Sequence, residues 1–243
     1  QFNKKYGGDA FQPDIYHGLY YAIKRYEPKD YNQLVGHTEA VRMIAPSYSS
    51  RGQIVYSTGS DGLIYRWDLK SPKNAPVLLG KTGTNVINRA LVVSRDGGFL
   101  ACGGDFNKVL LFTIDRNGKA SKKKISLNKG EKVWNLGFTP NNQGLVIHTS
   151  DQKLFYYDIK KKKKREIAQM ESKVNGMAVY HKPNGASHYI AITMDNGKLV
   201  LLDSNNNYQR QDFFTNTLNG KPVKMQAVSF STTGKFLAAG DVN

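Results

Sequence analysis

Five aspartates recur along the chain at nearly constant spacing, each shortly after an apolar, β-prone run. Successive members of the set are 44, 46, 44 and 46 residues apart, and they are Asp61, Asp105, Asp151, Asp195 and Asp241. A repeating unit of this length is one supersecondary structure, and it is too small to bury its own apolar side chains. Successive units must therefore pack against one another, which restricts the chain to a repeat architecture.

Every unit contains the same succession of short β-prone runs, separated by turn signals such as Asp96-Gly97 and Asn196-Gly197. The expected first strands are residues 40–45, 86–93, 133–138, 174–180 and 223–230. Second strands precede each aspartate, at 54–56, 99–102, 145–147, 189–192 and 236–239. Third strands follow it, at 63–67, 109–112, 154–157 and 199–202, and short fourth strands come next, at 77–79, 125–127, 166–170 and 209–214. We therefore expect four complete four-stranded units and the first two strands of a fifth.

The first unit carries a motif of its own. It opens with Gly36-His37, turns at Ser60-Asp61-Gly62 and closes with Trp67-Asp68, and in these features it resembles a repeat of the WD-repeat β-propeller family. Later units lack both the His and the Trp, and Phe112, Tyr157 and Leu202 stand where the Trp would be.

The resemblance implies an all-β fold, a β-propeller of four-stranded antiparallel blades preceded by a short N-terminal helix. Four blades would be complete and a fifth partial. A family ring of seven blades needs roughly 315 residues, so we expect the chain to be the N-terminal part of a longer propeller rather than an unusually small ring.

The residues before the first unit differ in character from the rest. Residues 1–30 are expected to form a linker with an amphipathic helix at 13–25, because Pro13 fits a first helical turn and apolar residues follow at helical spacing. This segment resembles the linker helix of large bacterial multidomain proteins; the alternative is a helix packed on the propeller rim. Residues 31–243 would be the propeller, with a leading outermost strand at 31–35.

The WD-repeat resemblance also implies a polar network in the first blade, made by His37, Thr58, Asp61 and Trp67. Its role would be structural, since a buried indole N–H and an imidazole both need partners. A hydrolase triad is the rejected alternative, because the base would point into a blade. His181 and His188 lack further ligands for a metal, and the turn that begins at Asp115 lacks those of a calcium loop. We expect no enzyme activity, no cofactor and no metal.

The charge balance is strongly basic, with 35 Lys and Arg against 19 Asp and Glu and a net charge of +16. Two runs concentrate it, and both are expected in loops between third and fourth strands, on one face of the ring: Lys122, Lys123, Lys124, Lys160, Lys161, Lys162, Lys163, Lys164 and Arg165. Such a face suits a polyanion, either nucleic acid or anionic lipid. The alternative is a set of solvated lysines that aid solubility.

The resemblance places partner binding on the other face, around the central channel. The residues expected there are His37, Glu39, Asp61, Asn85, Asp105, Glu131, Asp151, Glu171 and Asp195. We therefore expect a non-catalytic protein-interaction scaffold or sensor module that binds a protein partner and is coupled to an upstream effector domain. The chain has no signal peptide and no apolar run of 18 residues, so its sequence leaves the compartment open between cytoplasm and periplasm.

Overall fold

The computed structural model describes residues 34–50, 53–71, 74–83, 86–181, 187–231 and 233–242. The predicted linker 1–30 and its helix lie outside these ranges, as does most of the predicted strand at 31–35; Leu34 and Val35 are described and form no strand. Within the described ranges, no helix is both long enough and apolar enough to cross a membrane.

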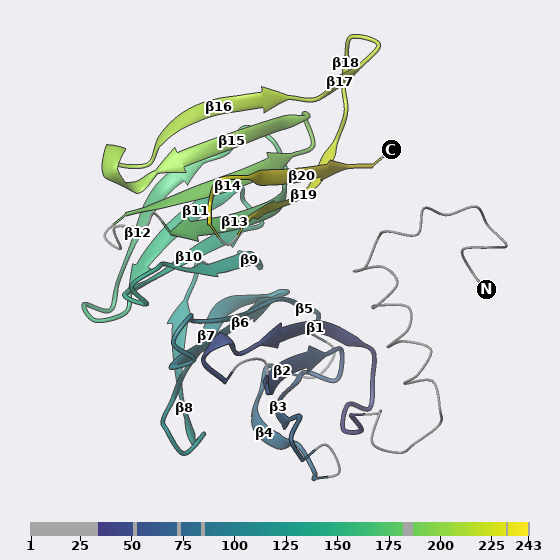
Figure 1. Ribbon diagram of the computed structural model, residues 1–243, viewed down its shortest axis with the longest axis vertical. Helices are drawn as coiled ribbons and strands as arrows, with labels where there is room; N and C mark the ends of the chain where they lie inside the picture. The colour runs from purple at the N-terminus through teal and green to yellow at the C-terminus, as the bar shows by residue number, and fades with distance from the viewer. Residues whose placement is uncertain are drawn as a thin grey trace, which may run out of the picture.

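Four antiparallel sheets of four strands follow one another along the chain, and the strands of each sheet pair in sequence order (Figure 1). Blade 1 consists of β1 (Val41–Pro46), β2 (Ile54–Gly59), β3 (Leu63–Asp68) and β4 (Val77–Lys81). Blade 2 consists of β5 (Asn88–Val93), β6 (Phe99–Gly104), β7 (Phe106–Ile114) and β8 (Ala120–Ser126). Blade 3 consists of β9 (Val133–Phe138), β10 (Gly144–Thr149), β11 (Lys153–Asp158) and β12 (Lys163–Gln169). Blade 4 consists of β13 (Val174–His181), β14 (His188–Met194), β15 (Lys198–Asp203) and β16 (Gln209–Thr215).

A fifth, two-stranded sheet follows, made by β19 (Met225–Phe230) and β20 (Leu237–Asp241). A small hairpin of β17 (Thr217–Leu218) and β18 (Lys221–Pro222) separates it from blade 4, and the described ranges also contain short 3-10 helices at Tyr48–Ser50 and Ser204–Asn206. The predicted all-β fold of four complete blades and part of a fifth is confirmed.

The first strand of each blade is the innermost, and each innermost strand contacts that of the next blade, in the order β1, β5, β9, β13, β19. The blades thus radiate outward from these five strands (Figure 1). This arrangement is the β-propeller geometry.

Among the described residues, the hydrophobic core is divided into four clusters, one at each interface between successive blades. Ile64 of blade 1 packs with Leu100 and Phe112 of blade 2, and Leu111 of blade 2 packs with Ile147 of blade 3. Residues of blades 3 and 4, and then of blades 4 and 5, make the remaining two clusters. Because each sheet is apolar on both faces, no blade can bury its side chains without a neighbour, as the repeat length predicted.

The pairing register identifies equivalent positions in the blades. Trp67 pairs with Val55, the second residue of β2. Phe112 and Tyr157 pair with the second residue of β6 and of β10, and Leu202 pairs with Ile190, the third residue of β14, which begins one residue earlier than the other second strands. All four side chains are buried. The residues predicted to replace the Trp therefore occupy its position in the sheet.

Candidate functional site

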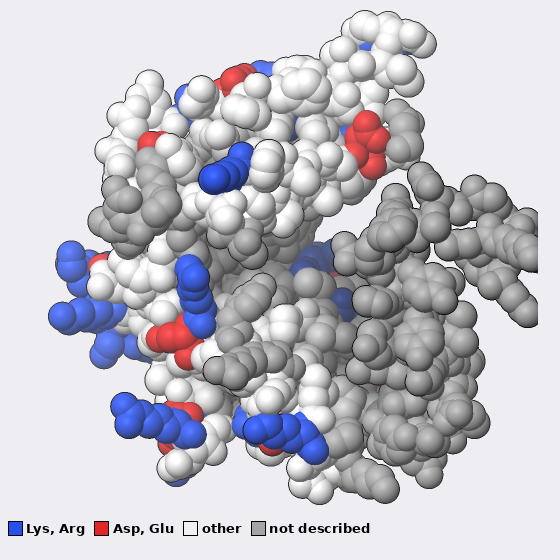
Figure 2. Space-filling model, viewed as in Figure 1, with Lys and Arg blue, Asp and Glu red and all other residues white. Residues whose placement is uncertain are grey.

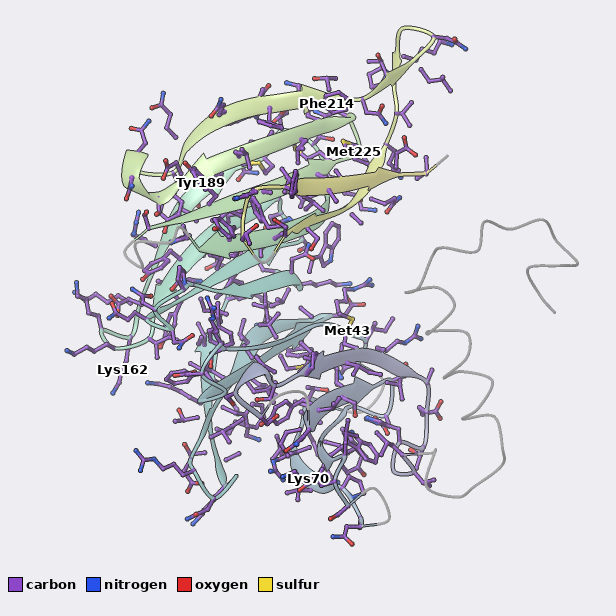
Figure 3. The ribbon with its side chains drawn as sticks, viewed as in Figure 1. Met43, Lys70, Lys162, Tyr189, Phe214 and Met225 are labelled. Carbon is purple, nitrogen blue, oxygen red and sulfur yellow. The ribbon has the colours of Figure 1, made fainter. Side chains whose placement is uncertain are left out.

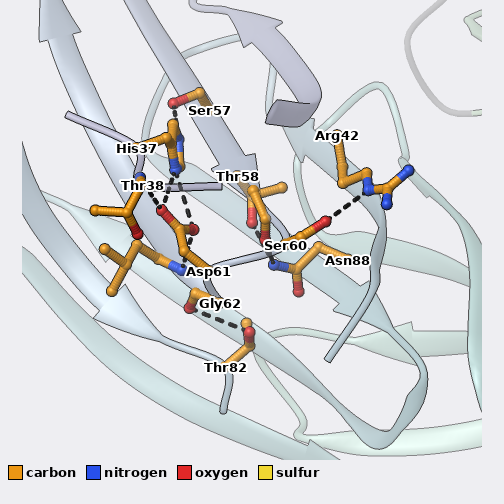
Figure 4. A network of polar contacts seen from close by, with 12 residues as sticks. His37, Thr38, Arg42, Ser57, Thr58, Ser60, Asp61, Gly62, Thr82 and Asn88 are labelled. Atoms are coloured by element: carbon orange, nitrogen blue, oxygen red, sulfur yellow. Dashed lines mark hydrogen bonds and ion pairs between the residues drawn. The ribbon is translucent and has the colours of Figure 1, made fainter. Parts of the chain in front are cut away.

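A chain of hydrogen bonds runs through blade 1, and Figure 4 shows the part of it that joins Ser57, His37 and Asp61. Trp67 Nε1 donates to Ser57 Oγ at 2.7 Å, Ser57 Oγ lies 2.7 Å from His37 Nε2, and His37 Nδ1 lies 2.9 Å from Asp61 Oδ2. The carboxylate of Asp61 can only accept, so the network assigns the imidazole proton to Nδ1 and makes Nε2 the acceptor for the Ser57 hydroxyl. Each member thus has a partner, and the chain ties β2 and β3 to the loop that precedes β1.

The hydroxyl in this network belongs to Ser57, whereas the WD-repeat resemblance predicted Thr58 for this role. Successive side chains of a strand point to opposite faces. Ser57 lies two residues from Val55, the partner of Trp67, and therefore shares the face of the indole. Thr58 faces the other way, where its Oγ1 accepts from Asn88 Nδ2 at 2.5 Å and so links blade 1 to blade 2.

Ser57, His37 and Asp61 have the connectivity of a catalytic triad, but the surroundings do not suit catalysis. Ser57 is only 4% exposed and its oxygen already accepts the indole N–H. The side chains of His37 and Asp61 are 4% and 5% exposed. The nucleophile and the base are therefore shielded from a substrate, and the geometry supports a structural role.

The charge of Asp61 is stabilised locally. Burial raises the pKa of this carboxyl, but hydrogen bonds from the Leu63 N–H, His37 and the Thr38 N–H outweigh burial and hold the pKa below its usual value. Asp61 therefore stays ionised to a lower pH than an ordinary aspartate does.

A second feature recurs in every blade. The pairing of the first strand with the second is interrupted by a bulge at the second residue of the first strand. The five residues at this position are Arg42, Arg89, Trp134, Asn175 and Gln226. A bulge commonly re-aims a side chain next to a functional site. The end of the propeller that carries these five residues and the turns after the second strands is called the turn face below.

Three bulge residues contact the turn of their own blade. Arg42 Nε donates to Ser60 Oγ at 2.7 Å, and Asn175 Nδ2 donates to Asp195 Oδ1 at 2.7 Å. Arg89 binds both carboxylate oxygens of Asp105, at 2.5 and 3.0 Å, and this pairing lowers the pKa of that carboxyl. The bulge residues are thus held beside the turn aspartates that set the repeat.

Trp134 is the aromatic member of the set. Its ring lies edge-on to His148, with centroids 5.9 Å apart, and Lys173 Nζ lies 5.6 Å from its centroid. Burial lowers the pKa of His148 to about 4, so this imidazole is neutral at physiological pH and packs as an uncharged ring. The indole is half-buried, which leaves part of it on the turn face.

A cavity of about 450 Å³ opens on the turn face between blades 1 and 2. It is lined by Thr38, Glu39, Arg42, Ser60, Asp61, Val86 and Ile87. Ile87 is 38% exposed, so the cavity offers apolar surface beside charged groups of both signs. The sequence placed Glu39 and Asp61 on this face and missed Arg42.

The basic runs lie on strands as well as in a loop, which corrects the sequence prediction. Lys122–Lys124 belong to β8 and Lys163–Arg165 to β12, while Lys160–Lys162 form the turn before β12. Both strands are the outermost of their blades, and Lys164 Nζ reaches Ser126 O across the gap between them at 3.3 Å. Basic side chains gather at the edge of the molecule in Figure 2, near the position of Lys162 in Figure 3. These nine residues are called the basic edge below.

The remaining candidates have ordinary surroundings. His188 Nε2 lies 3.1 Å from the Tyr208 hydroxyl, and the loop that joins His188 to His181 lies outside the described residues. Asp115 accepts the backbone N–H groups of Asn117 and Lys119, as in an Asx turn. In the part of the chain that is described, no three His, Cys, Asp or Glu side chains gather as a metal site would require.

Comparison with known proteins agrees with this geometry. The family described as "WD domain, G-beta repeat" matches residues 29–68, which include the polar network of blade 1. The chain is also 33% identical over 129 residues to "Small ribosomal subunit protein RACK1" of Neurospora crassa and 31% identical over 129 residues to "MST50-interacting protein 11" of Pyricularia oryzae. It is 28% identical over 117 residues to "U3 small nucleolar RNA-associated protein 18 homolog" of Homo sapiens.

These matches cover part of each protein. The first two span 53% of this chain and 38% of the relative, and the third spans 46% of this chain and 20% of the relative. The chain therefore spans well under half the length of these curated relatives. All three relatives are eukaryotic, so the resemblance to a bacterial multidomain type stays a prediction.

Proposed function

We propose that the protein is a non-catalytic interaction scaffold that binds a protein partner on its turn face, through the five bulge residues. The observation that carries the proposal is the bulge itself, which recurs at one position in all five innermost strands. The fold needs no particular side chain at this position, and the chain places Arg, Trp, Asn and Gln there.

The side chains of the five bulge residues are of kinds that suit protein recognition. Arg and Trp are among the residues that contribute most to binding at protein interfaces. Arg42, Arg89 and Gln226 are exposed, and Trp134 and Asn175 are half-buried and held in place by neighbours. One relative is named for its interaction with another protein, which also favours this reading.

Affinity capture with matched variants tests the proposal. The protein and an Arg89→Glu, Trp134→Ala variant would be used as baits, with Lys70→Glu as a control, since Lys70 is exposed in the loop after β3 (Figure 3). We expect quantitative mass spectrometry to find partners that the control retains and the variant loses. Equal recovery by all three baits would reject the turn face as the binding surface.

In a finer form of the proposal, the propeller is a sensor module that is coupled to an upstream effector domain. This form requires that partner binding change the activity of that domain. The activity of the effector, measured with and without the partner isolated above, decides between a sensor and a passive scaffold.

The basic edge favours a second candidate function, the binding of a polyanion. Within the described residues, no carboxylate lies within ion-pair distance of Lys122–Lys124 or of the five lysines at 160–164, although many other basic side chains are paired. Unpaired cations on neighbouring outer strands can neutralise successive phosphates. Two relatives are named for a ribosomal subunit and for association with a small nucleolar RNA, which supports the same reading.

A salt series tests this second candidate. Binding of a labelled RNA duplex, and separately of phosphatidylserine vesicles, would be measured for the protein and for a variant with Lys160–Lys163 changed to Gln. We expect affinity to fall steeply with salt and the variant to show a shallower slope. Affinity that is absent at low salt, or that does not change with salt, would exclude this role.

A further inference from the structure

The end of the propeller opposite the turn face also opens into a cavity. It encloses about 560 Å³ and receives residues from all five innermost strands, including Ile44, Val92, Leu136, Val179 and Phe230. This volume lies within the range of sites that bind small ligands or a few side chains.

The walls of this cavity are mainly apolar and well fixed. The rings of Tyr180 and Phe230 pack with centroids 5.2 Å apart, and the Tyr180 hydroxyl donates to Thr233 O at 2.8 Å. Gly137 lets β9 approach β13 closely, because a Cβ at this position would clash with Val179. Ile44 is 65% exposed, so apolar surface remains open to an incoming group.

The backbone adds a second property. β1, β5, β9, β13 and β19 are each the last strand of their sheet, so one edge of each has no strand partner among the described residues. Such an edge offers unpaired N–H and C=O groups, and an extended peptide is the ligand that satisfies them best.

Among the described residues that line the cavity, Arg95 is the charged one. Arg95, in the turn after β5, is exposed, and no carboxylate of the described residues lies within ion-pair distance of its guanidinium. The nearest acidic neighbour in sequence, Asp96, accepts hydrogen bonds from the Ser94 hydroxyl and the Gly98 N–H at its Oδ1 and forms no ion pair with Arg95. An unpaired guanidinium beside an apolar cavity suits a carboxylate.

We propose that this cavity is a second peptide site, which binds a partner segment that presents a large aliphatic or aromatic side chain next to a carboxylate. The apolar group would enter between Ile44, Val179 and Phe230, and the carboxylate would bind Arg95. The inference goes beyond the proposed function, because it uses the other face of the propeller and can fail without affecting the turn face.

Nuclear magnetic resonance titration with short blocked peptides tests the proposal. The probes would be N-acetyl-Gly-Leu-Asp-amide, N-acetyl-Gly-Leu-Lys-amide and N-acetyl-Gly-Ser-Asp-amide at millimolar concentration, with octanoate as a fourth. We expect the Leu-Asp peptide to bind best and to shift the methyl signals of Ile44, Val92 and Val179. The methyl signals of Val109, buried between blades 2 and 3, should stay unchanged.

Variants then separate the two faces. Arg95→Glu, at an exposed turn, should weaken the Leu-Asp peptide about tenfold and improve the Leu-Lys peptide, as expected for the loss of one charged hydrogen bond. Arg42→Glu on the turn face should change neither. The proposal is overturned if no peptide shifts these methyl signals, if acidic and basic peptides bind alike, or if octanoate binds as well as the Leu-Asp peptide.

Discussion

Blades 1 and 3 have the same four-stranded sheet and hold it together with different chemistry. In blade 1, Ser57 and Trp67 are joined by a hydrogen bond that continues to His37 and Asp61. The register places Ile147 and Tyr157 at the positions of Ser57 and Trp67 in blade 3, where every residue of β10 is buried. This difference indicates that the fold depends on apolar packing between blades, whereas the polar network is a local means of stabilising blade 1.

The largest loss of stability should follow a substitution in the apolar core between blades, because all blades depend on this packing. Phe112→Ala removes a fully buried ring at the interface of blades 1 and 2. We expect the free energy of unfolding to fall by about 3–5 kcal/mol, from lost burial and the cavity left behind. Urea denaturation measures it, with Phe236→Ala as a control, since Phe236 is 74% exposed. A loss for Phe112→Ala no larger than that of the control would contradict the primacy of packing.

The polar network of blade 1 should contribute less to the free energy of unfolding than the packing between blades does. Ser57→Ala leaves the indole N–H of Trp67 without its partner, because Ser57 Oγ accepts it in a buried site. We expect a loss of about 1–3 kcal/mol in the free energy of unfolding. Ser60→Ala is the matched control, because the Ser60 hydroxyl accepts an exposed hydrogen bond from Arg42 and its removal should change the free energy of unfolding by less than about 0.5 kcal/mol. The Trp67 indole N–H resonance reports directly on the lost bond.

A third substitution replaces the Trp of blade 1 with the Phe that blade 2 has at the equivalent position. Trp67→Phe places at this position the side chain that Phe112 supplies in the next blade. We expect a loss of about 1–2 kcal/mol, from one hydrogen bond and some ring volume. In a double-mutant cycle with Ser57→Ala, the losses should be less than additive. Additive losses would mean that Ser57 and Trp67 act independently.

The smallest expected effect is on how the free energy of unfolding changes with pH in the acidic range. The pKa of Asp61 is lower in the folded protein than in the unfolded chain, so the unfolded state takes up the proton first as pH falls. The stability that this carboxylate contributes is complete above the unfolded pKa of about 4 and is lost as pH falls through the folded value. We therefore expect Asp61→Asn to lose stability less steeply than the native protein below about pH 4 in urea titrations. Parallel curves would show that Asp61 is not stabilised by its neighbours.

The sequence predicts most of the architecture and less of the site. The spacing of the turn aspartates and the apolar runs between them predicted every blade, and Phe112, Tyr157 and Leu202 were placed correctly. Those signals are strong because they follow from burial, which the sequence records directly. Ser57 and Thr58 are adjacent hydroxyls in one strand, and only the pairing of Val55 with Trp67 decides which of them faces the indole.

The bulge residues and the lysine strands were missed for related reasons. A bulge is a property of two paired strands, so Arg42 or Trp134 carries no mark of it in its own sequence. In the run at 160–164, the lysines show no alternation of apolar and polar residues, so the sequence does not reveal where the turn ends and β12 begins.

The repeated bulge separates two tasks within each blade. The bulged residue lies at the start of its strand, whereas residues that pack between blades, such as Leu91 and Leu136, lie farther along it. One side chain per repeat can therefore be exchanged while the scaffold keeps its core. If the turn face binds a partner as proposed, a substitution at one bulge position would change the binding specificity contributed by one blade and leave the other blades as they are.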